Sequence, residues 1–163
     1  MDNSKVAQRL RSRIGPFSGD LSKGLCVPAQ RFVSEMVYGI QASQSVMLTE
    51  VGRTQEERVA LRKTEWRLSR NLQRPELEDV VQDNVLRMGA GHVGHDTLLI
   101  IDPSDVSKKY AKKMEYLATV RDGSAHDLAR GYWTLHIVGA QVDSNDIVPL
   151  YQRLWSQDAP GFV

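Results

Sequence analysis

The chain has 163 residues and a formal net charge of +1 at neutral pH, and 41% of its residues are hydrophobic and 25% charged. This composition is typical of a folded soluble protein and excludes a disordered chain, and the length suits one core or a helical module with part of a second domain. The single cysteine, Cys26, excludes an internal disulfide and a cysteine-based zinc site. No apolar run approaches a membrane span and the N-terminus does not resemble a secretory signal, so we expect a cytoplasmic protein.

The first half of the chain carries the spacing of helices. Residues 4–14 predict a short basic helix, and the glycines and proline of residues 15–24 predict a loop after it. Pro28 suits the first turn of a helix, and apolar residues at helical spacing predict an amphipathic helix over residues 28–41. A short helix over residues 43–51 follows closely. Such a pair is found in helix-turn-helix proteins and equally in any helical bundle, so both interpretations stay open.

Residues 55–72 predict a longer helix with an apolar stripe on one face and basic side chains on another. The basic side chains recur at i, i+4, i+7 and i+11, and they are Lys63, Arg67, Arg70 and Arg74. Glu65 is the one acid among them, so few local ion pairs can neutralise this face. We expect contact with the phosphate backbone of DNA, and the alternative is a solvated surface.

The pattern changes from helices to strands near residue 95. Pro75 opens the last predicted helix, and the glycine-rich residues 89–94 end it. Residues 97–101 (TLLII) are wholly apolar and are followed by Asp102-Pro103, which suits a strand that is buried on both faces and ends there.

Two further strands are predicted in the last third of the chain. Residues 132–142 and 147–155 are rich in aromatic and β-branched side chains, and four residues connect them, which indicates a hairpin. Pro149 cannot donate a hydrogen bond to a neighbouring strand, so we expect the last strand at an edge of the sheet.

Asp102 is the principal candidate for chemistry. A carboxylate at the end of a buried strand is a recurring position for a metal ligand, although an Asp-Pro turn is the simpler alternative. Asp105 could share a cation with Asp102 or cap the segment after it. A group of lysines comes next, namely Lys108, Lys109, Lys112 and Lys113. A carboxylate beside lysines suits a site where a metal ion meets a nucleic-acid backbone.

Several other polar and aromatic residues have simpler interpretations. His136 falls within a predicted strand, where a partly buried histidine with satisfied hydrogen bonds is expected. His92 and His95 have no third convergent ligand and are interpreted as linker residues. The tryptophans, among them Trp133 and Trp155, are expected to pack in the core or at its edge.

Three segments together resemble one family. Residues 98–117, 120–142 and 146–155 are similar to the opening of the catalytic domain in insertion-sequence DDE transposases, which have a ribonuclease-H-like fold. In that family a first strand ends in the first catalytic aspartate, often within an Asp-x-Ser/Thr-Asp-x-x-Lys pattern. This pattern is reproduced by Asp102, Ser104, Asp105 and Lys108.

Further features extend the resemblance to both sides of this pattern. Gly131-Tyr132-Trp133 matches the family's aromatic-rich second strand, and Trp155 matches the end of its third strand. Upstream, residues 60–88 resemble the segment in which an aromatic-x-x-x-Arg-Asn signature precedes a final helix.

The resemblance implies an α+β or α/β protein in which a helical DNA-binding region, residues 1–94, precedes the first three strands of a ribonuclease-H-like mixed sheet, residues 95–163. It implies double-stranded DNA as partner, both transposon ends and target, with a nucleoid-associated location, and it leaves a homodimer open. In the complete enzyme two divalent ions, most simply Mg²⁺, would be held by Asp102 and two later acids for DNA cleavage and strand transfer.

This sequence departs from the family in one respect. The second and third acids have no counterpart here, so we expect a truncated chain that is inactive alone. Two alternatives remain, namely a non-catalytic DNA-binding or inhibitory fragment and a ribonuclease-H-like nuclease that is not a transposase.

Overall fold

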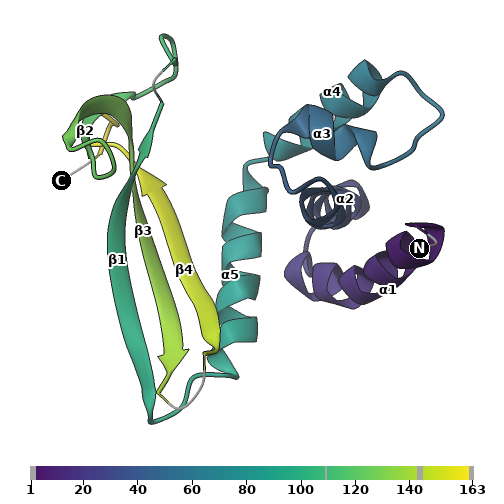
Figure 1. Cartoon of the computed structure of the whole chain (residues 1–163), viewed down its shortest axis with the longest axis horizontal. Coiled ribbons are helices and arrows are strands. Elements are labelled where there is room, and N and C mark those ends of the chain that lie inside the picture. The colour runs from purple at the N-terminus through teal and green to yellow at the C-terminus, as the bar shows by residue number, and fades with distance from the viewer. Residues whose placement is uncertain (1–2, 109, 143–144, 162–163) are drawn as a thin grey trace. The chain divides into compact units, whose positions relative to one another are not determined.

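The computed structural model describes residues 3–108, 110–142 and 145–161. These residues form five helices followed by an antiparallel sheet of four strands (Figure 1). The expected mixed composition, helices first and strands after, is therefore confirmed. The chain divides into two compact units, residues 1–84 and 85–163. Within the described ranges, no helix has both the length and the apolar character that crossing a membrane requires.

The first unit is built of helices. They are α1 (Asn3–Leu21), α2 (Val27–Ser43), α3 (Leu48–Arg53), α4 (Leu61–Leu72) and the beginning of α5 (Glu76–Ala90). Phe32 and Val33 of α2 are buried together with Val51 of α3 and Leu68 of α4, so these helices share one apolar core. The predicted helix over residues 28–41, with proline in its first turn, agrees with α2, and the helix expected after Pro75 agrees with α5.

Helix α1 continues to Leu21, so the loop predicted over residues 15–24 is wrong for residues 15–21 and agrees with the structure only in the turn after them. Pro16 lies inside the helix and removes one backbone donor. Ile14 and Leu21 are nevertheless buried, and α1 packs against α2. This packing outweighs the weak helix propensity of glycine and proline, which is a local term. The turn after α1 is held by the buried Asn84, whose Nδ2 donates to the carbonyls of Leu21 and Lys23 at 2.9 Å each.

Helix α4 begins six residues later than the sequence predicted. Glu56 has a positive φ of 53°, which a helix does not tolerate, so the segment between α3 and α4 is not helical. Gln55 donates from Nε2 to the carbonyl of Glu35 at 3.1 Å. Side-chain contacts to α2 thus override the helical periodicity of this segment.

The second unit contains the sheet, whose strands are β1 (Thr97–Ser107), β2 (Ala118–Asp122), β3 (Asp127–Gln141) and β4 (Ile147–Trp155). β3 is the central strand and pairs antiparallel with each of the other three. The predicted hairpin of the last two strands is confirmed, and β4 has the predicted bounds. β2 was not predicted, because its five residues alternate in a polar, lysine-rich stretch that has no long apolar run.

The two prolines of the sheet lie where a missing donor costs nothing. The Lys108 amide donates to the Arg130 carbonyl of β3 at 2.7 Å. Successive backbone amides of a strand point to alternate sides, and Pro103 lies an odd number of residues before Lys108. The nitrogen of Pro103 therefore points away from β3. The amide of Gln141 on β3 donates to the carbonyl of Asp146, so the backbone of Asp146 faces β3. By the same alternation, the nitrogen of Pro149 points away from β3. β4 pairs with β3 at one side, so the edge position predicted from Pro149 is confirmed.

Strand β1 differs from the prediction in length and burial. It does not end at Asp102 but continues to Ser107. Its apolar residues were expected to be buried on both faces, yet Leu99 is 60% exposed and Ile101 63% exposed, and their neighbours Leu98 and Ile100 are also exposed. A strand is buried on both faces only where other elements cover both faces, and the exposure of these side chains shows that, among the described residues, this part of β1 is not covered in that way. The buried apolar residues of this unit are instead Leu117, Ala118 and Val120 in and just before β2, Tyr132 on β3, and Leu150 on β4, which lies against Gly139.

Candidate functional site

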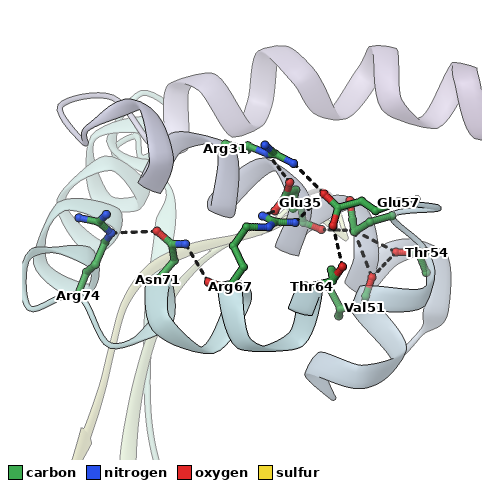
Figure 2. A network of polar contacts seen from close by, with 10 residues as sticks. Arg31, Glu35, Val51, Thr54, Glu57, Thr64, Arg67, Asn71 and Arg74 are labelled. Atoms are coloured by element: carbon green, nitrogen blue, oxygen red, sulfur yellow. Dashed lines mark hydrogen bonds and ion pairs between the residues drawn. The ribbon is translucent and has the colours of Figure 1, made fainter. Parts of the chain in front are cut away.

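Arg67 of α4, one of the predicted DNA contacts, lies in a network of charged side chains (Figure 2). Its guanidinium donates to the carboxylate of Glu35 on α2 and, from Nη2, to Oε1 of Glu57 at 2.9 Å. Arg31 bonds the same two carboxylates, at 2.6 Å and 2.8 Å. The hydroxyl of Thr64 donates to Glu57 Oε2 at 2.7 Å. Arg67 therefore joins α2, α4 and the segment before α4.

The protonation of this network agrees with a structural role. The hydrogen bond from Thr64, with the hydrogen bond from Arg67 and the charges of Arg67 and Arg31, outweighs desolvation and holds the pKa of Glu57 below its ordinary value. Partial burial alone would lower the pKa of Arg67, but its hydrogen bonds to Glu35 and Glu57 outweigh that effect and raise it. Both groups therefore stay charged at neutral pH, and the positive charge of Arg67 is neutralised within the protein.

Arg74 is also engaged within the protein. It lies after the end of α4, where its Nε donates to Oδ1 of Asn71 at 3.0 Å and its Nη1 lies 3.3 Å from Glu76. Asn71 in turn donates to the Arg67 carbonyl at 2.9 Å, which ties the helix end to the network above. Arg74 thus forms its contacts at the C-terminal end of α4.

The remaining two residues of the predicted basic face are oriented differently. Lys63 and Arg70 are exposed, and within the described residues neither forms an ion pair. Lys63 lines an open hollow with Arg31, Arg58 and Arg67, where Glu57 is the acidic residue. Arg31 and Arg67 pair with Glu35 and Glu57, so Arg58 and Lys63 make the surface of this hollow positive, which suits contact with phosphate. The structure thus divides the basic face into two engaged residues and two solvent-facing ones.

The α2–α3 pair gives little support to a helix-turn-helix. α3 has six residues, and Val51 and Gly52 are buried in it. A Cβ on Gly39 of α2 would lie 2.5 Å from Val51, so the two helices are in close contact through this glycine. The exposed Arg53 at the end of α3 is paired with Glu50. The bundle interpretation therefore agrees better with the geometry, because a recognition helix needs an exposed face.

Asp102 and Asp105 both lie on β1, but they do not form one site. Side chains of a strand alternate between its faces, so residues three apart point to opposite sides of the sheet. Asp105 accepts a hydrogen bond on Oδ1 from the amide of Gly123 at 3.1 Å. Asp105 therefore contacts the turn between β2 and β3, which is neither of the two roles considered for it, and it lies on the opposite face of the sheet from Asp102.

The structure describes three of the four lysines that follow β1. The Lys108 side chain is half-buried, and its amide extends the β1–β3 pairing. Lys112 and Lys113 are exposed, whereas Lys109 lies outside the described residues. Exposed lysines can contact phosphate without a fixed geometry, so their predicted role stays a prediction.

Asp102 is directly opposite His136 of β3 in the sheet register, and His136 is directly opposite Gln152 of β4. Opposed residues of antiparallel strands point to the same face, with Cβ atoms about 5 Å apart. His136 Nε2 lies 3.3 Å from the hydroxyl of Thr134. The sequence pointed to Asp102 and not to this row, because strand register is not readable from a single chain.

Asp102 has the chemistry of a ligand for a divalent ion, since it is an exposed carboxylate on a paired strand. Within the described residues, however, no three His, Cys, Asp or Glu side chains are close enough together to hold a metal ion. The described residues therefore do not complete a coordination sphere around Asp102.

No family model, no curated protein and no solved structure matches the chain.

Proposed function

We propose that this chain is the N-terminal part of a DDE transposase, in which the helical unit holds the DNA backbone and Asp102 is the first metal ligand. The observation that carries the proposal is the order of the three long strands. β1, which bears Asp102, pairs with β3, and β3 pairs with β4 at an edge. The resemblance implies this order for the opening of the catalytic domain, and β2 lies where the family has a variable loop.

The roles of the residues follow from their exposure. Lys63 and Arg70 would contact phosphates, and Arg67 would hold the helices that carry them. Such contacts position the backbone without reading bases, so this unit alone would bind DNA with little sequence preference. A divalent ion bound at Asp102 would supply Lewis-acid activation of a phosphate or of a water molecule. The Asp102 carboxylate would fix the position of that ion.

Duplex binding at several salt concentrations, measured by fluorescence anisotropy, tests the proposal. Each lost phosphate contact lowers the slope of log K against log salt by roughly 0.9, so the double variant Lys63→Gln/Arg70→Gln should lower it by about 1.8. The matched control is Arg13→Gln/Lys23→Gln, which removes the same charge from exposed residues elsewhere on the first unit. Equal slopes for both double variants would contradict a specific role for the α4 face, and no duplex binding by the unaltered chain would contradict the proposal.

A non-catalytic DNA-binding or inhibitory fragment is the second candidate, and one observation favours it. Within the described residues no group of three ligands is present, and a two-metal mechanism requires several ligands. We therefore expect the 163-residue chain to leave supercoiled plasmid intact with Mg²⁺ or Mn²⁺. Nicking that is abolished by Asp102→Ala would instead support a nuclease.

A further inference from the structure

A polar row crosses one face of the sheet. Asp102, His136 and Gln152 are opposed in register on β1, β3 and β4, and therefore share a face. The next row toward the start of β1 is apolar, with Ile100 opposite Val138. The register therefore places a carboxylate next to an imidazole on one face of the sheet.

Two side chains of this row, those of Asp102 and His136, carry groups that can bind a ligand. Within the described residues, the carboxylate of Asp102 accepts no hydrogen bond. His136 has one side-chain contact, the 3.3 Å approach of its Nε2 to the Thr134 hydroxyl. That contact leaves Nδ1 for another partner, and a hydrogen bond to the second ring nitrogen is how proteins orient a ligating histidine.

The separation of the two residues suits a shared cation. Zinc lies about 2 Å from both an imidazole nitrogen and a carboxylate oxygen. Opposed side chains with Cβ atoms about 5 Å apart can therefore meet one ion between them. Imidazole favours zinc and similar transition ions, whereas Mg²⁺ strongly prefers oxygen ligands.

We propose that His136 is a second metal ligand, which shares one divalent transition-metal ion with Asp102. The inference rests on the proposed role of Asp102 as a metal ligand and adds a nitrogen ligand from β3. It departs from the expectation of Mg²⁺ at Asp102, because the added imidazole favours zinc-like transition ions. Thr134 acts as the positioning residue, because its hydroxyl contacts the other nitrogen of the ring.

The test is a titration of the full chain with Zn²⁺, followed by NMR of the histidine ring nitrogens. The chain has four histidines, so each ring can be resolved and assigned with single alanine variants. We expect a saturable shift of the His136 ring that is lost in Asp102→Asn and is not produced by excess Mg²⁺. Asp96→Asn is the matched control, since Asp96 lies 3.3 Å from the ring of the exposed His95 and should affect that ring alone.

The NMR signal of the Asp102 backbone amide is followed in the same samples, and its response distinguishes the possible results. If this amide shifts with Zn²⁺ or Mg²⁺ while the His136 ring does not, the inference is wrong and the role of Asp102 stands. If the His136 ring shifts equally in Asp102→Asn, the two residues do not share an ion and the inference is wrong. If neither responds to either metal, both the inference and the proposed role of Asp102 fail.

Discussion

Arg67 of α4 and Glu35 of α2 form an ion pair across 32 positions of the chain. The Glu35 side chain is 12% exposed and that of Arg67 30% exposed, so the pair is partly shielded from water. Glu57 accepts a second hydrogen bond from the same guanidinium. The pair therefore contributes to the packing of the helical unit.

We predict that Arg67→Gln destabilises the helical unit. The substitution removes hydrogen bonds to two carboxylates and leaves Glu35 partly buried without this partner. Hydrogen bonds to charged groups contribute about 1.5–3 kcal/mol each, and partial exposure reduces this, so the expected loss is about 1–2 kcal/mol. Urea unfolding followed by far-ultraviolet circular dichroism measures it. Lys63→Gln, on the same helix face, should change the free energy of unfolding by less than about 0.5 kcal/mol, and equal losses would contradict the assigned roles.

The free energy of unfolding should fall at acid pH, because the Glu57 carboxylate becomes protonated. The pKa of Glu57 is lowered in the folded chain from its ordinary value of 4.5, first by the hydrogen bond from Thr64. A carboxyl group with a lowered folded pKa stabilises the fold above its unfolded pKa, and that contribution is lost as pH falls through the folded value. The loss should therefore begin near pH 4.5 and continue below it.

The matching variant is Glu57→Gln, which should be less stable than the unaltered chain at pH 7 and should lose less stability on acidification. The urea concentration at the midpoint of unfolding, measured for both proteins at pH 7 and at pH 3, tests both effects. A parallel fall in the midpoints of the two proteins would show that Glu57 does not carry this dependence.

Asp102→Asn should scarcely change the stability of the chain. The carboxylate is exposed and accepts no hydrogen bond within the described residues, so the amide replaces it without a lost contact. We expect a change within about 0.5 kcal/mol, as for most surface substitutions. Thermal unfolding in the presence of a chelator measures the folding contribution alone. A large loss would show that Asp102 is a structural residue and would remove the main support for its role as a metal ligand.

The open edge of β1 should make the chain associate. Leu99 and Ile101 direct their amides away from β3 and their side chains are exposed, and such an edge is a template for pairing. A lysine at this edge opposes pairing, so Leu99→Lys should lower the concentration-dependent association seen by sedimentation velocity. Leu128→Lys is the matched control, because Leu128 is 70% exposed but lies on β3 opposite Arg121. Equal effects of the two substitutions would attribute association to general hydrophobicity.

Local patterns in the sequence determined several elements of this fold. The helical spacing after Pro28 predicted α2, and the segment after the four-residue connection was predicted as a strand with the observed bounds of β4. Pro149 predicted an edge strand, because a proline lacks the donor that a central strand needs. These predictions depend on residues near one another in the chain, so no tertiary contact was required.

Contacts between distant residues decided the remainder. Arg67 has the spacing of a solvent-facing basic stripe, and Glu35 and Glu57 make it structural. Asp102 and Asp105 are close in sequence, yet the continuation of β1 places them on opposite faces, and register brings Asp102 beside His136. An apolar run looks the same in a strand whose faces are covered as in a strand whose faces are open. Burial of residues 97–101 therefore depended on which elements pack on the faces of the sheet, which is a property of the tertiary structure.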